Sequence, residues 1–166
     1  FDTFDFTQQE ELMHKLIEKS IEHDFLIMED RKFNDISSIV EKQYKQFSNW
    51  IDLVTVHTLV SADVIQKLSG VLLVANMSNN NYNFTDKAIE LAKDNKDHVI
   101  GFITQKKINC DDLVSMTPGI SFQVSNKDDQ NYRSHKEVDT DFYIIGRTIY
   151  ECDDPETAIK IFLDPV

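Results

Sequence analysis

Short apolar runs alternate with amphipathic stretches along most of the chain. Apolar residues spaced three or four apart predict helices, and compact runs rich in β-branched residues predict buried strands. The pattern predicts six strands, at Phe25–Met28, Leu53–Val60, Val71–Ala75, Val99–Ile103, Leu113–Met116 and Phe142–Ile145. Helices are predicted from Thr7, which forms a capping-box pattern with Glu10, over 36–47, from Ser61, over 85–93 and from Asp153.

This rhythm of strand and helix predicts an α/β fold with an all-parallel sheet covered by helices. Residues 1–166 fit one domain, whereas a complete eight-unit barrel usually needs about 200–250 residues. An open doubly wound sheet and a (β/α) barrel both agree with the pattern. In either architecture ligands bind where the strands end, so the position of the polar residues does not choose between them.

Composition narrows the classes of function. The formal net charge of −12 and the pI near 4.7 argue against general binding to nucleic acid. No apolar run reaches the roughly 18–20 residues of a membrane helix, and no signal-peptide pattern follows Phe1. Cys110 and Cys152 have no partners at metal-ligand spacing, so we expect neither a zinc site nor a disulfide framework. This use of cysteine fits a reducing environment, and we expect a cytoplasmic location. Because no Met stands first, we expect a fragment or a processed chain.

The most informative segment is Glu29–Ile36, at the end of the first predicted strand. Alternate residues of an extended chain share a face, so Asp30 and Lys32 should point to the same side. Asp35 falls where the helix begins. A carboxylate beside an ammonium keeps both charged, and it can oppose a substrate carboxylate next to a proton donor. A solvated charge cluster is the alternative interpretation.

This segment, FLIMEDRKFNDI at Phe25–Ile36, resembles the catalytic strand of orotidine 5′-monophosphate decarboxylases, which carries an EDRKF-x-DI signature. Five further segments resemble that family in the same order. They are Trp50–His57, Ala75–Ser78, Val99–Ile103, Met116–Gly119, and Gln130–Tyr132 followed by Ile144–Arg147. The resemblance covers roughly residues 1–150 and is compatible with a separate enzyme or with the decarboxylase part of UMP synthase. It implies a TIM-type barrel with about six of its eight β/α units in this chain.

The resemblance also implies a mechanism without metal or cofactor. Asp30 would place negative charge against the C6 carboxylate of orotidine 5′-monophosphate, and Lys32 would deliver a proton to C6 as carbon dioxide leaves. Asp35 would reach into the site of a partner subunit, so a homodimer is implied. The product would be UMP.

Substrate-binding residues follow from the matching motifs. Arg147 would hold the 5′-phosphate with its planar guanidinium, helped by the Gly146 amide and by Gln130 and Tyr132. Ser78 would read the pyrimidine edge, and Pro118 would line the site. From the residues alone, Arg147 could be a surface arginine and Ser78 a helix cap. His57, which titrates near neutrality, is interpreted as structural.

The sequence departs from the family pattern at several places. Asp2 resembles the end of a K-x-H-x-D element, which puts the family's first catalytic lysine before Phe1. The G-N-T that usually follows the motif aspartate and its isoleucine is replaced by Ser37–Ile39, and the acid of A-E-[LM]-S is Asn76. Gly is scarce in the phosphate-binding loops, which removes positions of close backbone approach.

Three functions therefore compete. The first is decarboxylation of orotidine 5′-monophosphate. The second is a catalytically impaired barrel remnant that binds a nucleotide or a protein partner. The third is a magnesium-dependent decarboxylase or aldolase of sugar phosphates, whose superfamily also uses D-x-K-x-x-D. The context Arg31–Phe33 and the Met116–Gly119 segment favour the pyrimidine branch over this third function.

Overall fold

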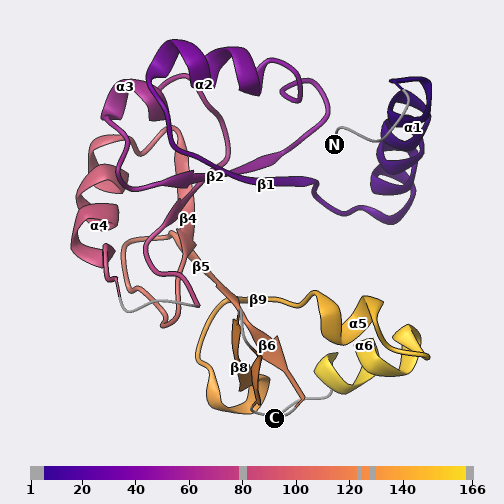
Figure 1. Ribbon diagram of the computed structural model, residues 1–166. Coiled ribbons are helices and arrows are strands. Elements are labelled where there is room, and N and C mark those ends of the chain that lie inside the picture. The colour runs from indigo at the N-terminus through magenta and orange to yellow at the C-terminus, as the bar shows by residue number, and fades with distance from the viewer. Residues whose placement is uncertain (1–5, 79–81, 123–124, 128–129, 164–166) are drawn as a thin grey trace.

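A computed structural model of the chain describes residues 6–78, 82–122, 125–127 and 130–163, without the side chains of 6–9, 125–127 and 130. Its centre is a six-stranded parallel sheet in the order β1-β2-β3-β4-β5-β9. The strands are β1 (Met28–Phe33), β2 (Leu53–His57), β3 (Val71–Val74), β4 (Val99–Ile103), β5 (Val114–Pro118) and β9 (Phe142–Ile144). Figure 1 shows the sheet curling into part of a ring. Because the strand order follows the chain without a reversal, the fold is a partial (β/α) barrel and not a doubly wound sheet.

Three helices cover the convex face of this sheet: α2 (Ser37–Tyr44), α3 (Ala62–Ile65) and α4 (Thr85–Asp94). The larger hydrophobic core lies between them and the strands, and it includes Val54 and Val56 of β2 and Phe102 of β4. A smaller apolar cluster built on Leu72 and Val74 involves the alternate residues of β3. Successive strand residues point to opposite faces, so this second cluster belongs to the concave face.

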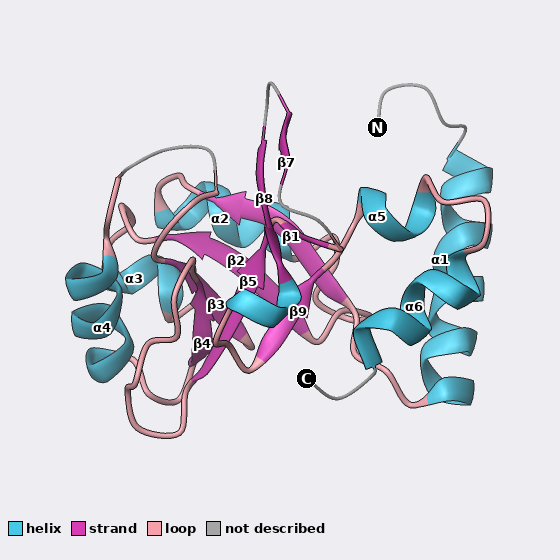
Figure 2. Ribbon diagram, turned by 90° about the horizontal axis from the view of Figure 1, so that it is seen from below, coloured by secondary structure: helices cyan, strands magenta, loops and turns pink. Residues whose placement is uncertain are grey.

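A second sheet, which the apolar pattern did not predict, follows β5. It contains β6 (Ile120–Ser121), β7 (Ser125–Lys127) and β8 (Gln130–Ser134) in the order β6-β8-β7, and a 3-10 turn η1 (His135–Glu137) leads on towards β9. The Arg133 guanidinium donates to both the backbone carbonyl and the side-chain oxygen of Gln105, which ties this sheet to the loop after β4. Figure 2 shows β7 and β8 projecting from the main sheet. These strands are short and polar, so hydrophobic periodicity could not reveal them.

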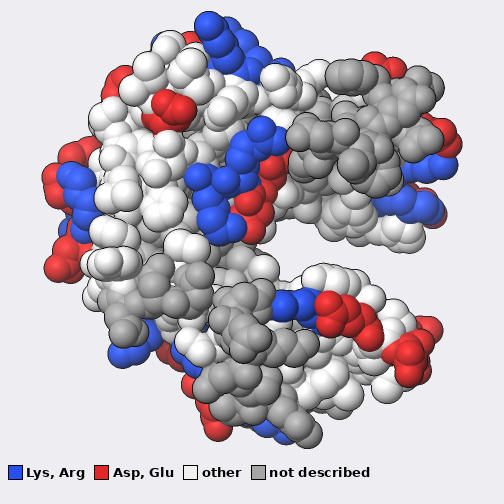
Figure 3. Space-filling model, in the orientation of Figure 1, with Lys and Arg blue, Asp and Glu red and all other residues white. Residues whose placement is uncertain are grey.

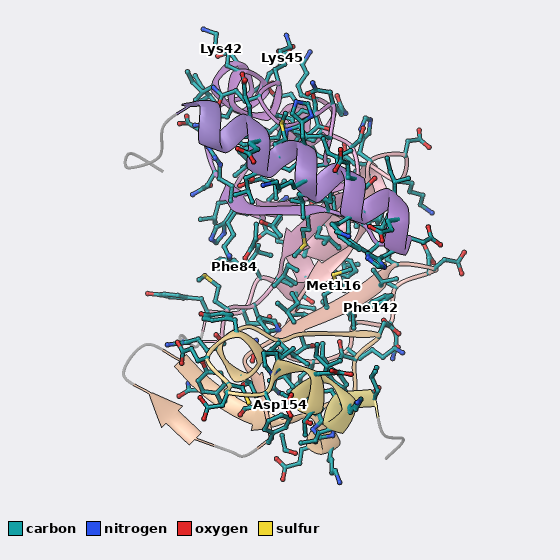
Figure 4. All side chains as sticks on the ribbon, turned by 90° about the vertical axis from the view of Figure 1, so that its right-hand side faces the viewer. Lys42, Lys45, Phe84, Met116, Phe142 and Asp154 are labelled. Atoms are coloured by element: carbon teal, nitrogen blue, oxygen red, sulfur yellow. The ribbon has the colours of Figure 1, made fainter. Side chains whose placement is uncertain are left out.

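The remaining helices, α1 (Phe6–His23), α5 (Arg147–Tyr150) and α6 (Pro155–Leu163), lie on the open side of the ring. The apolar face predicted for α1 exists but faces solvent, with Leu12 66% and Ile21 78% exposed. Figure 4 looks into this side, where Met116 and Phe142 lie between α1 above and α5 and α6 below. Within the described ranges, every helix is too short or too polar to traverse a lipid bilayer.

The first strand was predicted too early. β1 begins at Met28, where Phe25–Met28 was expected to end, and Phe25 and Leu26 are exposed. The reason is the neighbouring strand: the register begins with Met28 opposite Leu53, and the Ile27 carbonyl accepts from the Leu53 N–H, so Phe25 and Leu26 precede the paired region. The other predicted strands are present, with β2 ending earlier, at His57, and β5 shifted to Val114–Pro118.

Candidate active site

A cavity of about 590 Å³ opens at the carboxyl ends of the strands, on the concave side of the sheet. It is lined by seven of the predicted site residues: Asp30, Lys32, Ser78, Pro118, Tyr132, Gly146 and Arg147. Apolar side chains of Val74, Ile103 and Ile144 form its floor. Its volume is within the roughly 300–1,000 Å³ of small-molecule sites. Segments separated by more than a hundred residues therefore meet around one space.

The wall formed by β1 is irregular in backbone. Glu29 pairs with Val54 and Phe33 with Val56, so β1 carries two more residues than β2 between these pairs. Inside this bulge Lys32 has φ +55°, in the left-handed region that non-glycine residues rarely adopt. Bulges redirect side chains, and here Asp30 and Lys32 both line the cavity.

The Asp30–Lys32 ion pair predicted from their spacing is present. Lys32 Nζ lies 2.7 Å from Asp30 Oδ2. The other carboxylate oxygen, Oδ1, accepts a hydrogen bond of 2.9 Å from the Thr55 hydroxyl. The Thr55 oxygen in turn accepts a 2.9 Å hydrogen bond from the backbone N–H of Lys32. Asp30 and Lys32 keep 50% and 34% of their side-chain surface exposed, so the pair faces an open cavity and not a dry interior.

Arg31, between them in sequence, is directed elsewhere. Its guanidinium lies 4.6 Å from the centre of the Phe47 ring, and its Nε donates to Glu29. It does not line the cavity. Acidic and basic side chains meet over β1, and again over α5 on the other side of the hollow (Figure 3).

The opposite wall is formed by β8 and the start of α5. Tyr132 is buried, and the Arg147 guanidinium lies over its ring, 5.5 Å from the centre. Gly146 precedes Arg147 and also lines the cavity. Stacking on an aromatic ring orients the planar guanidinium, which suits it to bind an anion by two parallel hydrogen bonds.

Two predicted residues are not placed at the cavity. Asp35 is exposed between β1 and α2, and its carboxylate accepts the Ile36 backbone N–H at 2.7 Å. It does not line the cavity of its own chain. Gln130 begins β8, two residues before Tyr132, but its side chain lies outside the described residues.

His57, at the end of β2, does not line the cavity either. Its ring meets Phe84 edge-on at 6.5 Å, and its Nδ1 is buried without a hydrogen-bond partner in the described part of the chain. Burial lowers the pKa of His57, and the positive charge of Lys32 lowers it further. The neutral form is therefore favoured near pH 7.

Asparagine side chains hold the segment between the end of β3 and Ser78 through hydrogen bonds. The Ser78 carbonyl accepts from the Asn131 side chain, which links it to β8. Asn76 accepts from the Thr104 hydroxyl through Oδ1 and donates to Asn83 Oδ1 through Nδ2, both at 2.9 Å. A glutamate at position 76 has no N–H to donate to Asn83. The departure from A-E-[LM]-S is thus matched by a local partner.

Thr55 is the residue that sequence reasoning missed. It is fully buried and contacts both members of the ion pair. The signal was present in the run LVTVH. Val54 and Val56 face the outer core, so Thr55 is a polar residue on the concave face, between two apolar neighbours.

The comparisons with known proteins agree with this geometry. The family model described as Orotidine 5'-phosphate decarboxylase / HUMPS family matches residues 3–162. The chain belongs to this family. An orotidine 5'-phosphate decarboxylase of Rhizopus oryzae is 35% identical over 164 residues, which cover 84% of this chain and 62% of that protein. A uridine 5'-monophosphate synthase of Caenorhabditis elegans is 32% identical over 177 residues, covering 91% of this chain and 36% of that protein.

Solved structures show the same fold. The orotidine 5'-monophosphate decarboxylase of Methanocaldococcus jannaschii, complexed with the inhibitor BMP, aligns with a TM-score of 0.68 and 22% identity over 92% of this chain and 80% of that one. The chain thus spans less than two thirds of these two relatives but most of that barrel. The partial TIM barrel that the resemblance implied is confirmed.

Proposed function

We propose that the protein decarboxylates orotidine 5′-monophosphate to UMP in pyrimidine biosynthesis. Family membership supports the reaction, and one observation carries its assignment to this cavity. The Asp30–Lys32 ion pair and the Tyr132-stacked Arg147 line opposite walls of a single space of nucleotide size. A phosphate held by Arg147 would anchor the nucleotide with its pyrimidine ring towards β1.

In the proposed reaction the bond between C6 and its carboxylate carbon breaks, and carbon dioxide leaves. The electron pair stays on C6 and takes a proton from Lys32 Nζ, and solvent then reprotonates the amine. The Asp30 carboxylate disfavours the substrate carboxylate, and the ammonium favours the developing negative charge on C6. Ser78 would bind the pyrimidine edge and Pro118 would line its face, while Gly146, Gln130 and Tyr132 would complete the phosphate site.

The direct test is turnover by the product of the complete reading frame. We expect decarboxylation of orotidine 5′-monophosphate in the presence of a metal chelator, because the proposed steps use only side chains. Absence of turnover would refute the proposal. Activity restored by magnesium on a keto-sugar phosphate would favour the sugar-phosphate branch instead.

We further propose a homodimer in which Asp35 serves the partner's cavity. This is supported by Asp35 being exposed and absent from the cavity of its own chain. Two inactive variants, Lys32→Ala and Asp35→Ala, should therefore complement each other when their subunits are exchanged. A mixed dimer then contains one site with both residues intact, so statistical mixing restores about a quarter of parental activity. No recovery would show that Asp35 acts within its own subunit or not at all.

A second candidate, nucleotide binding without turnover, is favoured by the exposure of the ion pair. Electrostatic effects on a substrate are strongest where water is excluded, and half of the Asp30 side chain is exposed. Calorimetry with UMP separates the two candidates. Binding of UMP without turnover of orotidine 5′-monophosphate would establish the second.

A further inference from the structure

The bulge in β1 leaves the ion pair without the regular strand pairing that would otherwise fix it. Between Glu29 and Phe33 the register with β2 shifts, and the backbone of Lys32 is left-handed. A backbone N–H at such a position still needs an acceptor. The Lys32 N–H finds it in a side chain, the Thr55 hydroxyl, at 2.9 Å.

The Thr55 hydroxyl both accepts and donates a hydrogen bond. Its oxygen accepts from Lys32 N, and its single hydrogen is donated to Asp30 Oδ1. Lys32 Nζ holds the other carboxylate oxygen, Oδ2. The orientation of the Asp30 carboxylate is therefore set by two different contacts, one of which comes from a neighbouring strand.

Thr55 is itself firmly placed. It is fully buried, and the residues on either side, Val54 and Val56, belong to the outer core and have no exposed surface. β2 is paired on both sides, to β1 and to β3. A hydroxyl fixed in this way carries the geometry of the packed sheet to the Asp30 carboxylate and to the backbone N–H of Lys32 on the neighbouring strand β1.

From these contacts we infer that Thr55 is a positioning residue that holds Asp30 and Lys32 in the arrangement required for decarboxylation, a role that rests on the proposed function. Thr55 does not line the cavity, so it acts through the pair and not on the substrate. The loss of its hydroxyl would misplace a proton donor without changing the phosphate site.

The test compares Thr55→Val, which keeps the shape and removes the hydroxyl, with Thr55→Ser, which keeps the hydroxyl. Both are made in the product of the complete reading frame. Thr58→Val is the matched control, because Thr58 is also buried, directly after β2, and among the described residues its hydroxyl bonds only the Val74 carbonyl. For each variant, kcat, KM and hydrogen exchange of the Lys32 amide are measured.

We expect Thr55→Val to lower kcat by about 10- to 100-fold with KM nearly unchanged, since one charge-assisted hydrogen bond is lost. Exchange of the Lys32 amide should accelerate by about 10-fold or more, because its acceptor is gone. Thr55→Ser should stay within about threefold of the parent in both measurements, and Thr58→Val likewise. Should Thr55→Val fail to fold, Thr55→Ala against Thr55→Ser isolates the same hydroxyl.

Four results are decisive. Normal kcat and normal Lys32 exchange in Thr55→Val would overturn the inference, as would a rise in KM alone. A serine variant as impaired as the valine variant would also overturn it, because packing of the methyl group would then be responsible. If the parent shows no turnover while Lys32 exchange still responds to loss of the hydroxyl, the proposed function fails but the placement of the pair by Thr55 stands.

Discussion

The middle strands and the edge strands of the sheet differ in what they carry. β2, β3 and β4 are paired on both sides and are almost wholly apolar, and they contribute six of the twelve largest fully buried side chains in the described part of the chain. β1 and β9 end the sheet within the described residues, and the ion pair and Arg147 lie on or directly after them. The middle of the sheet therefore fixes geometry, while its two edges carry the proposed chemistry.

The same division explains where apolar surface is exposed. The large hydrophobic side chains left in solvent are concentrated near the edges, on α1, α6 and Phe142 of β9. Unpaired strand edges and uncovered apolar faces are sites where another segment or chain can pack. The following predictions test how separate the two regions are, beginning with the largest effect.

Removing the proposed proton donor at one edge should have the largest effect. We expect Lys32→Ala to lower kcat by about 10²- to 10⁴-fold, as is typical for loss of a general acid. UMP binding should remain, because the phosphate is held on the other wall. Arg31→Ala is the matched control, since Arg31 is the adjacent cation but contacts Phe47 and Glu29 outside the cavity. Equal losses in both variants would contradict a specific role for Lys32.

The free energy of unfolding should depend on the middle of the sheet more than on the proposed site at its edges. Phe102→Ala, in the buried middle of the sheet, should lower the free energy of unfolding by about 3–5 kcal/mol because it leaves a cavity. Leu12→Ala, on the exposed face of α1, should change it by less than about 0.5 kcal/mol. Chemical denaturation of the complete product measures both. A cost above about 2 kcal/mol at Leu12 would show that this face is covered in the assembled protein.

The wall of the cavity that carries Arg147 should control the affinity for UMP. We expect Arg147→Ala to weaken UMP binding by about 10- to 100-fold in calorimetry, the range for a lost hydrogen bond between charged groups. Fold stability should change little, because Arg147 lies at the cavity and not in the core. Arg31→Ala again serves as the control. Unchanged affinity in Arg147→Ala would remove this residue from the site.

The smallest effect concerns pH. Because the pKa of His57 is lowered in the folded protein, the unfolded chain takes up a proton first as the pH falls below about 6.5. The free energy of unfolding should therefore decrease as the pH falls from about 6.5 through the pKa of His57 in the folded protein. At higher pH His57 is neutral in both states, so it does not make stability depend on pH. His57→Leu should flatten that part of the stability profile, measured by denaturation from pH 8 to pH 5. An unchanged slope would contradict the burial of His57.

The accuracy of the sequence prediction also differs between the middle and the edges of the sheet. β4 was predicted at its observed bounds and β3 within one residue, because an apolar run covered on both faces is a strong local signal. β1 was predicted too early, since its extent depends on where β2 begins. The pairing of Asp30 with Lys32 was predicted from alternation, although the bulge and the left-handed Lys32 were not.

By itself the sequence determined the parallel β/α architecture, the family and seven of the residues that line the cavity. Hydrophobic periodicity and short motifs are local properties of the sequence, so they can be recognised without knowledge of the fold. Tertiary structure alone decided that the Arg147 guanidinium lies over the Tyr132 ring and that Thr55 joins both members of the ion pair. These relations join residues far apart in the chain, and their distances exist only after the sheet has set the register of its strands.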